Sequence, residues 1–484
     1  MNSFQHLCIT SDEAISECSE MTDNIIALGA YTEEEGWNIF NVTTNNKYSN
    51  EKQSYFAGYL EGYIYCDKIN YHFTNIKDTL YNGQIILSDK AKEYIKTQRD
   101  VIASLCDEGK DDYAETMKYV MKQYEGLYKG YCDGYETKGD KTFNLISEEE
   151  FYYISYLGDL YDVNQAYPKT VSQSSFLYHK ECTGYVKYIP SLKELYVAHN
   201  THNIYSMMNR IYKHYDIKLK LQSGSVLNSV KFTSRPGDLN SKDDFYITSA
   251  QMAIIETSLE IYNKELYQHL QSNTIPKWLR VNIANRLSQN NQQWIDIFLK
   301  MNSGTHNNQW LIIDYKMIEA QSDIISLLEQ TANINNKYYK DMTGELLSKG
   351  YIGSYNAPYF EEVKKECGYK DEGDYYHANR YHIIRALDRT IGDIKGVKFL
   401  IDYHDSVNLC DQIGARCDIG TDNPFGAIDA KITNRSMIGN MQAMIRYGPP
   451  YMDGVSLPFQ FGSKYRKFSH FGIPEKFEYK WIIS

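Results

Sequence analysis

The order of strand-like and helix-like segments predicts an α+β fold built mainly from antiparallel sheets. Short runs of alternating apolar residues are grouped together, and runs with helical spacing are grouped elsewhere in the chain. This grouping differs from the regular strand–helix alternation that is typical of parallel sheets. With 484 residues, of which 42% are hydrophobic and 23% charged, the chain can bury a large core. The length is compatible with two or three domains, or with one large two-sheet domain.

The N-terminal third is expected to begin with strands and continue with helices. Trp37–Thr44 and Gln53–Tyr63 flank a polar turn at residues 45–50. Apolar residues recur with helical spacing between residues 88 and 129, which predicts helices there. The glycine- and charge-rich stretch from Tyr131 to Asp140 is expected to be a loop.

The remainder of the chain is predicted to alternate between groups of strands and groups of helices. Leu279, Ile283 and Leu287, for example, form one apolar stripe of a helix. The expected helices cover residues 204–214, 278–287 and much of 376–407. The expected strands lie between residues 182 and 200, around 230–232, and over 245–256 and 310–315.

Charge and hydropathy exclude several classes of function. The net charge is −11, whereas nucleic-acid binding needs a cationic surface, so we expect no nucleic-acid partner. The same charge argues against simple electrostatic docking to anionic membranes. No apolar stretch is long enough to cross a bilayer, so we expect no transmembrane segment.

Cysteine usage and the N-terminus bear on cofactors and on the cellular compartment. The nine cysteines show neither a CxxC motif nor a Cys/His cluster with metal-ligand spacing, so we expect no metal and no cofactor. The polar N-terminus lacks the basic and apolar regions of a signal peptide. Two glycosylation triplets, at Asn41 and Asn434, would be modified only on the secretory route.

Cys182 is the first candidate for chemistry. A polar loop from Tyr167 to Glu181 runs into it, an alternating strand follows, and after a turn at Pro190 a second strand reaches His199. A cysteine at the start of a strand combines access from the loop with a fixed direction. Taken alone, however, a cysteine near a histidine is more often a small buried hydrophobe.

The chain as a whole resembles the phospholipase B-like family of lysosomal lipid hydrolases. The resemblance begins at Gly36-Trp37 and Gln53–Gly62 and reaches the C-terminus. Its most specific blocks, which occur in the order of the family, are Leu195–Thr201, Arg235–Tyr246, Asn302–Trp310, Gly353–Phe360, Gly426–Lys431, and Gly448–Tyr451 followed by Phe459–Phe461.

This resemblance implies one four-layer αββα sandwich of the N-terminal-nucleophile hydrolase type, covering residues 1–484. It also implies autocatalytic cleavage between Glu181 and Cys182 into fragments 1–181 and 182–484. Cleavage would free the α-amino group of Cys182, and this amine could serve as general base for its own thiol because its ordinary pKa lies near 8.

The resemblance places four further residues in the active site. His199 would orient the nucleophile or protonate a leaving group; alternatively, its ring bonds a backbone carbonyl and has a structural role. Asn356 would help to hold the oxyanion, and Arg380 supplies a fixed cation. Ser258 stands where the family has threonine and keeps the hydroxyl. His202 stands where relatives usually carry tryptophan, which would place a titratable group at the wall of the acyl site.

Three more features follow from the resemblance or from local patterns. The resemblance implies a disulfide between Cys410 and Cys417, and the alternative is two free thiols on a surface loop. The block Asn302–Trp310 is expected to form a turn around Gly304 that leads into a buried strand. Asp243 and Asp244 could be an acid/base pair, but they are expected to cap a turn or a helix.

The functional expectation is a hydrolase that removes fatty acyl chains from phospholipids or other acyl lipids. The resemblance also implies a lysosomal or secreted location. An amidase that acts on N-acyl amides would use the same residues. A non-catalytic family member that binds lipid or protein stays open as well, as does a homodimer.

Overall fold

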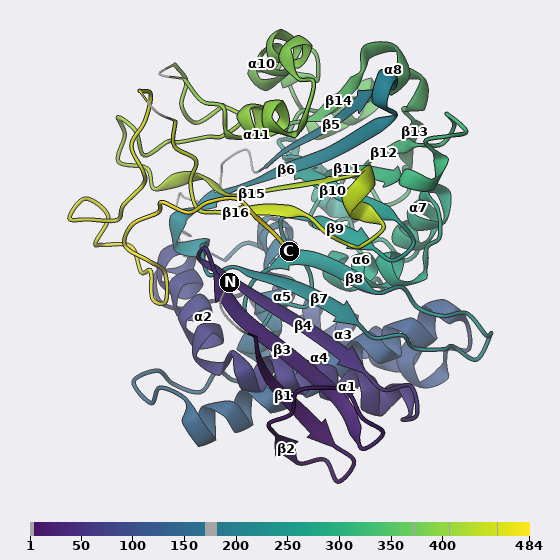
Figure 1. Ribbon diagram of the computed structural model, residues 1–484. Helices are drawn as coiled ribbons and strands as arrows, with labels where there is room; N and C mark the ends of the chain where they lie inside the picture. Colours follow the sequence, from purple (N-terminus) through teal and green to yellow (C-terminus); the bar gives the residue numbers. More distant parts are fainter. Residues whose placement is uncertain (1–3, 170–181, 371–372, 406, 453) are drawn as a thin grey trace.

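The computed structural model describes residues 4–169, 182–370, 373–405, 407–452 and 454–484. It has the α+β architecture that the sequence predicts: two mainly antiparallel sheets pack against each other, and helices cover their outer faces (Figure 1). The expected loop before Cys182 lies largely outside the described residues.

The larger sheet has eleven strands, and all but one of its pairings are antiparallel. The exception is the parallel pair β4–β7. In spatial order the strands are β13 (Tyr338–Asp341), β12 (Ile325–Glu329), β11 (Asn308–Asp314), β10 (Met252–Ser258), β9 (Phe245–Thr248), β8 (Val230–Ser234), β7 (Ile211–Asp216), β4 (Trp37–Thr44), β3 (Ile25–Glu34), β1 (Gln5–Thr10) and β2 (Ile15–Ser16).

The smaller sheet is antiparallel and contains the expected strand pair after Cys182. A short 3₁₀ turn (Pro190–Leu192) connects the two strands of that pair, β5 and β6, as the proline predicts. In spatial order the strands are β14 (Tyr351–Ser354), β5 (Thr183–Ile189), β6 (Glu194–Ile204), β15 (Phe425–Asn434), β16 (Met444–Tyr447) and β17 (Ile482–Ile483).

The helices form the two outer layers. Those that cover the larger sheet lie mostly in the N-terminal third and around residue 280: α1 (Asn50–Ile64), α2 (Cys66–Tyr81), α3 (Asp89–Glu108), α4 (Asp112–Lys138), α5 (Glu148–Ala166), α6 (Lys277–Leu287) and α7 (Asn291–Leu299) (Figure 1). The helices of the other side, and the shorter ones, are α8 (Thr343–Lys349), α9 (Glu361–Cys367), α10 (Asn379–Leu387), α11 (Ile394–Asp402) and α12 (Arg435–Ile438).

Polar residues fix where the N-terminal helices begin. The side chains of Ser49, Ser88, Asp111 and Ser147 each accept a hydrogen bond from a backbone amide in the first turn of α1, α3, α4 or α5. These bonds satisfy amides that have no partner within the helix. The order of strands before helices in this third of the chain is confirmed, but Gln53–Tyr63, which was grouped with the strands, lies within α1.

Glycines bring α1 and α4 into close contact. A Cβ atom at Gly58 would lie 1.9 Å from the backbone oxygen of Gln123, and one at Gly126 would lie 1.8 Å from that of Tyr55. Gly62 and Gly130 approach the opposite helix as closely. The glycine-rich stretch from Tyr131 therefore continues α4 to Lys138 instead of forming the expected loop. Packing against α1 offsets the weak helical propensity of glycine.

The expectation of a helix over residues 204–214 is also wrong. Only a 3₁₀ turn (Tyr205–Met207) forms, and residues 211–216 make the strand β7 between β4 and β8. In so short a window, the spacing of apolar residues fits the period of a helix as well as that of a strand. The segment is a strand because it pairs with β4 on one side and with β8 on the other. The single strand expected over residues 245–256 is two strands, β9 and β10, joined by a turn at which Gln251 has a φ of 57°. The remaining expected strands and helices after residue 182 are confirmed.

Candidate active site

Cys182 immediately precedes β5, which lies between β14 and β6 in the smaller sheet. Its side chain is buried, with 1% of its surface exposed, and its φ of 72° lies in the left-handed region that non-glycine residues seldom adopt. Its carbonyl oxygen accepts a hydrogen bond of 2.6 Å from Nη1 of Arg380. The cysteine is therefore held in an unusual backbone conformation by a side chain from α10.

Arg380 is the centre of the site. Nη1 also donates to Oγ1 of Thr183 (2.8 Å), while Nη2 donates to the carbonyl of Tyr355 (2.9 Å) and to Oδ1 of Asn356 (2.6 Å). Nε donates to Oδ1 of Asp411 at 3.0 Å. Burial lowers the pKa of Arg380 and Asp411 opposes this effect, so the group stays a cation. One guanidinium thus joins the start of β5, the segment after β14 and the loop of residues 407–417.

Asn356 connects Arg380 to Ser258. It follows β14 with a φ of 65°, a conformation that asparagine tolerates better than most residues. Its Nδ2 donates to the carbonyl oxygen (2.8 Å) and to Oγ (3.2 Å) of Ser258, at the end of β10. Cys182, Arg380, Asn356 and Ser258, which the sequence comparison with the family singled out, therefore belong to one hydrogen-bonded group.

A chain of buried polar side chains supports Asn356 from behind, and sequence reasoning missed it. Thr257 accepts from the backbone amide of Asn356 (3.2 Å), and its hydroxyl lies 2.7 Å from that of Ser354. Ser354 donates to Gln309 (2.6 Å), which donates in turn to the buried carboxyl of Glu329. Burial raises the pKa of Glu329 to about 7. Because these residues come from four different strands, only the assembled sheets bring them together.

His199 lies on the face of the smaller sheet that meets the larger one. It pairs with Gly184 on β5 and with Lys431 on β15, and its Nε2 lies 2.8 Å from the carbonyl oxygen of Glu256 on β10. A carbonyl only accepts, so Nε2 carries the proton and Nδ1 is the acceptor of a neutral ring. This contact matches the structural alternative considered for His199, and no described hydrogen bond joins its ring to Arg380 or Asn356.

We expect His199 to stay neutral from pH 8 down to pH 5. Burial, assisted by the charge of Lys431, holds the pKa of its ring well below 6.5. The neutral ring therefore stabilises the fold fully above pH 6.5, and this contribution is lost as the pH falls below that value. In NMR spectra of the histidine rings, the His199 signals should not titrate between pH 5 and 8. A titration midpoint within this range would contradict the assignment, and loss of the same signals in His199→Gln identifies them.

His202 does not share the face of His199. The two residues are three apart in a regular strand, so their side chains point to opposite faces. Nε2 of His202 lies 2.8 Å from the carbonyl oxygen of Ile413, the same oxygen that accepts a bond from Asn200 (2.9 Å). It therefore faces the helical layer around α11, and the expected role at the wall of the acyl site does not fit this direction.

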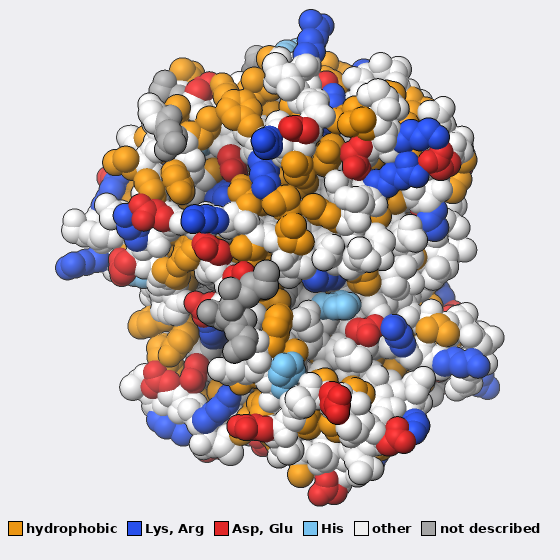
Figure 2. All heavy atoms as spheres, in the orientation of Figure 1, with side chains coloured by type: hydrophobic (Ala, Val, Ile, Leu, Met, Phe, Trp, Pro, Cys, Tyr) orange, Lys and Arg blue, Asp and Glu red, His pale blue; other side chains and the backbone are white. Residues whose placement is uncertain are grey.

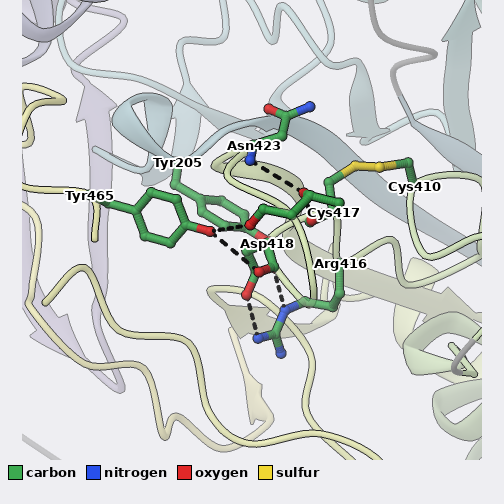
Figure 3. Close-up of a disulfide and its surroundings, with 8 residues drawn as sticks. Tyr205, Cys410, Arg416, Cys417, Asp418, Asn423 and Tyr465 are labelled. Carbon is green, nitrogen blue, oxygen red and sulfur yellow. Dashed lines mark hydrogen bonds and ion pairs between the residues drawn. A yellow bond between two sulfur atoms is a disulfide. The ribbon is translucent and has the colours of Figure 1, made fainter. Parts of the chain in front are cut away.

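The loop of residues 407–417 binds Arg380 through Asp411. Within it, a disulfide joins Cys410 to Cys417 (Figure 3). This is the pairing that the resemblance implies. Next to it, Asp418 accepts two bonds from Arg416 (2.9 and 2.8 Å) and one from Tyr205 (2.6 Å). The bridge and this ion pair restrain the loop whose Asp411 binds Arg380. A second disulfide, which was not foreseen, joins Cys8 to Cys18.

Asp243 and Asp244 are buried ion-pair partners, not caps. Asp243 contacts Arg210 (2.9 Å) and Arg235 (2.5 Å), and Asp244 contacts Lys277. Although burial alone would raise it, Arg235 and Arg210 hold the pKa of Asp243 well below its usual range. The expectation of capping was wrong because a charge pattern in the sequence does not show which partners the sheets supply. The block Asn302–Trp310 has the expected form, with Gly304 (φ 70°) in a turn that leads into β11.

A pocket of about 90 Å³ adjoins the site at Ser258. Its walls combine apolar and polar side chains, among them Leu157, Tyr161, Met207, Phe425 and Asn203. Elsewhere, the described part of the face in Figure 2 shows Lys and Arg interspersed with Asp and Glu. No group of three or more His, Cys, Asp or Glu side chains able to hold a metal occurs within the described ranges. Of the helices that the structure describes, none has the length and apolar character needed to span a bilayer.

Comparison with known proteins gives one consistent result. The family model described as Phospholipase B matches residues 27–484. Phospholipase B-like protein G of Dictyostelium discoideum is 28% identical, with 96% of this chain and 87% of that protein aligned. Phospholipase B-like 1 of Bos taurus (28%) and Phospholipase B of Crotalus adamanteus (29%) each align with 92% of this chain and 85% of their own length. The chain therefore belongs to the phospholipase B family.

Proposed function

We propose that this protein is a hydrolase that removes fatty acyl chains from phospholipids, with Cys182 as an N-terminal nucleophile. Membership of the phospholipase B family supports the class of reaction. The observation that supports the residues is the bonding of Arg380, which joins the Cys182 carbonyl to Asn356 and through it to Ser258. A nucleophile, an amide donor and a fixed cation are the groups that acyl transfer requires.

The first step in this proposal is cleavage of the bond between Glu181 and Cys182. The positive φ of Cys182 supports this step because such a conformation costs about 1 kcal/mol or more in a non-glycine residue. Cleavage would release that constraint and create the α-amino group. Arg380 would keep the new N-terminus in place through the Cys182 carbonyl, which cleavage leaves intact.

Acyl transfer would then use groups that already converge. The α-amine takes the proton of the Cys182 thiol, and the sulfur attacks the ester carbonyl. Nδ2 of Asn356 exchanges its longer bond, to Oγ of Ser258 (3.2 Å), for one to the resulting oxyanion, and the amine returns the proton to the leaving alcohol. Water hydrolyses the thioester by the same route. Arg380 holds the Oδ1 atom of Asn356, so the amide nitrogen is the atom directed away from it.

The disulfides support folding in an oxidising compartment, such as the secretory route or a lysosome. Cys8–Cys18 and Cys410–Cys417 are both bridged. Asn434, by contrast, is a poor glycosylation site: it is 7% exposed, and its side chain caps α12 by accepting from the amide of Met437. Asn41, in β4, is the more accessible of the two triplets.

Cys182→Ala is expected to stay a single chain of 484 residues and to release no fatty acid. The parent protein should give fragments 1–181 and 182–484 by intact mass, and the cleaved form should release fatty acid from phosphatidylcholine vesicles. Cys106→Ala, which removes a half-buried thiol of α3, serves as the control and should behave like the parent.

Three outcomes would contradict the proposal. Cleavage of Cys182→Ala at the parental rate would show that the cysteine is not the group that attacks. Release of acid from N-acyl amides, without release from ester lipids, would identify an amidase instead. A cleaved protein that hydrolyses neither would point to a binding role.

A further inference from the structure

The position of Lys431 relative to Cys182 follows from the strand register. On the face directed toward the larger sheet, Gly184, His199 and Lys431 lie side by side on β5, β6 and β15. Thr183, the first residue of β5, pairs with Asn200, so Cys182 lies just beyond this pair, at the end of the pairing nearer to Thr201. Thr201 pairs with Asp429 in the next strand. The segment Asp429-Ala-Lys431, which belongs to the family block Gly426–Lys431, therefore lies across β6 from the start of β5.

Lys431 is a fully buried cation with two polar partners. Its Nζ donates to Oδ1 of Asp429 (2.6 Å) and to Oγ1 of Thr201 (2.6 Å), and neither Lys431 nor Asp429 is exposed. An ammonium group has three protons, and these are its only hydrogen bonds within the described part of the chain. Thr201 follows Asn200, the partner of Thr183, so Lys431 binds β6 next to the place where Cys182 adjoins this strand.

Asp429 compensates the charge of Lys431 only in part. Its other oxygen, Oδ2, lies 2.7 Å from Nη2 of Arg210, so one carboxylate serves two cations. A charge taken out of water is unfavourable unless an opposite charge is close. Burial accordingly lowers the pKa of Lys431, whereas Asp429 and an ionised Cys182 favour its charged form. A negative charge on Cys182 would therefore be stabilised by Lys431.

We propose that Lys431 is a positioning residue for the nucleophile, whose ammonium group stabilises the thiolate of Cys182 from the side between the sheets. The ionisation itself breaks only the S–H bond, and the proton goes to solvent or, in the cleaved chain, to the α-amine. The inference concerns the acidity of the thiol, so it can hold even if the lipid substrate of the proposed function is wrong.

The other charged and titratable groups around Cys182 do not replace Lys431. Arg380 approaches from α10 but is bound to the carbonyl of Cys182 and paired with Asp411. His199, on β6, is neutral because burial keeps its pKa low. Asp429, on β15, opposes thiolate formation through its own charge, which Arg210 and Lys431 hold in place.

The test measures the acidity of Cys182 directly. The rate of alkylation by iodoacetamide is followed from pH 5 to 10, and peptide mass spectrometry separates Cys182 from the other free cysteines. Lys431→Met removes the charge with little change in volume, and it should raise the apparent pKa of Cys182 by about one unit or more. Asp429→Asn removes the negative charge that partly compensates Lys431, so it should lower the apparent pKa of Cys182.

The control is Lys213→Met, because Lys213 is equally buried and paired with Glu61 (2.7 Å) but lies on β7 of the other sheet. It should leave the Cys182 profile unchanged. Opposite shifts in Lys431→Met and Asp429→Asn cannot come from a general loosening of the fold, which would shift both in one direction. An unchanged pKa of Cys182, or equal shifts of it in both variants, would overturn the proposal. If Lys431→Met does not fold, the Asp429→Asn variant alone decides: a lowered pKa of Cys182 supports the proposal, and a raised or unchanged one overturns it.

Discussion

Arg380→Lys is expected to reduce fatty-acid release by at least about a hundredfold and to destabilise the fold by about 3 kcal/mol. The five N–H groups of Arg380 donate to five oxygens, on Cys182, Thr183, Tyr355, Asn356 and Asp411. A lysine has three protons at one point and cannot reach two sides of the site at once. Buried acceptors therefore lose partners, and Asn356 loses its orientation, as would the N-terminus that the proposed cleavage creates at Cys182.

The measurement combines urea unfolding with a fatty-acid assay on protein whose cleavage has been checked by mass. Arg385→Lys is the matched control, since Arg385 lies on the same helix and is exposed. It should change the free energy of unfolding by no more than about 0.5 kcal/mol and leave activity intact. If the Arg380 variant is cleaved, folded and fully active, the site does not depend on this residue.

Gly126→Ala is expected to be among the most damaging single-methyl additions in the protein. The new Cβ would lie 1.8 Å from the backbone oxygen of Tyr55, far inside contact distance. Neither backbone can yield locally, because Gly58, Gly62 and Gly130 hold the same two helices together above and below. The helices must separate, so we expect a loss of about 3 kcal/mol or more in the free energy of unfolding.

Gly344→Ala is the matched control, and its expected change in the free energy of unfolding has the opposite sign. Gly344 lies in α8 with no atom within 4 Å of a Cβ and no positive φ. Alanine should therefore stabilise the protein by about 0.5–1 kcal/mol, by restricting the unfolded chain. Urea midpoints for both variants test the pair. An unchanged midpoint for Gly126→Ala would show that the helices are not in such close contact.

Local patterns predicted those elements whose neighbours agree with them. The alternation after Cys182 and the stripe of Leu279, Ile283 and Leu287 became β5 and α6 because the buried faces are already visible in the spacing. Residues 131–138 and 211–216 were mispredicted for a common reason. Glycines favour a loop unless another helix packs on them, and an ambiguous apolar run becomes a strand when a sheet edge is open beside it.

The candidate site shows the same division between sequence and tertiary structure. Family blocks in the sequence were sufficient to single out Cys182, Asn356 and Arg380, and these residues lie in one hydrogen-bonded group. Nothing in the sequence indicated that Asp411 anchors the arginine, or that His202 faces away from the site. Side-chain direction depends on strand parity and on which layer covers each face.

The sequence by itself determined the family of this protein, its α+β class and the identity of its candidate nucleophile. The tertiary structure alone decided which charges meet. Lys431 and Asp429 are two residues apart and look like an ordinary surface pair in the sequence, yet both are fully buried and lie opposite His199 and Thr201 of β6. The physical reason is that the electrostatic effect of a charge depends on burial and on its nearest partners, and these are set by contacts between strands far apart in the chain.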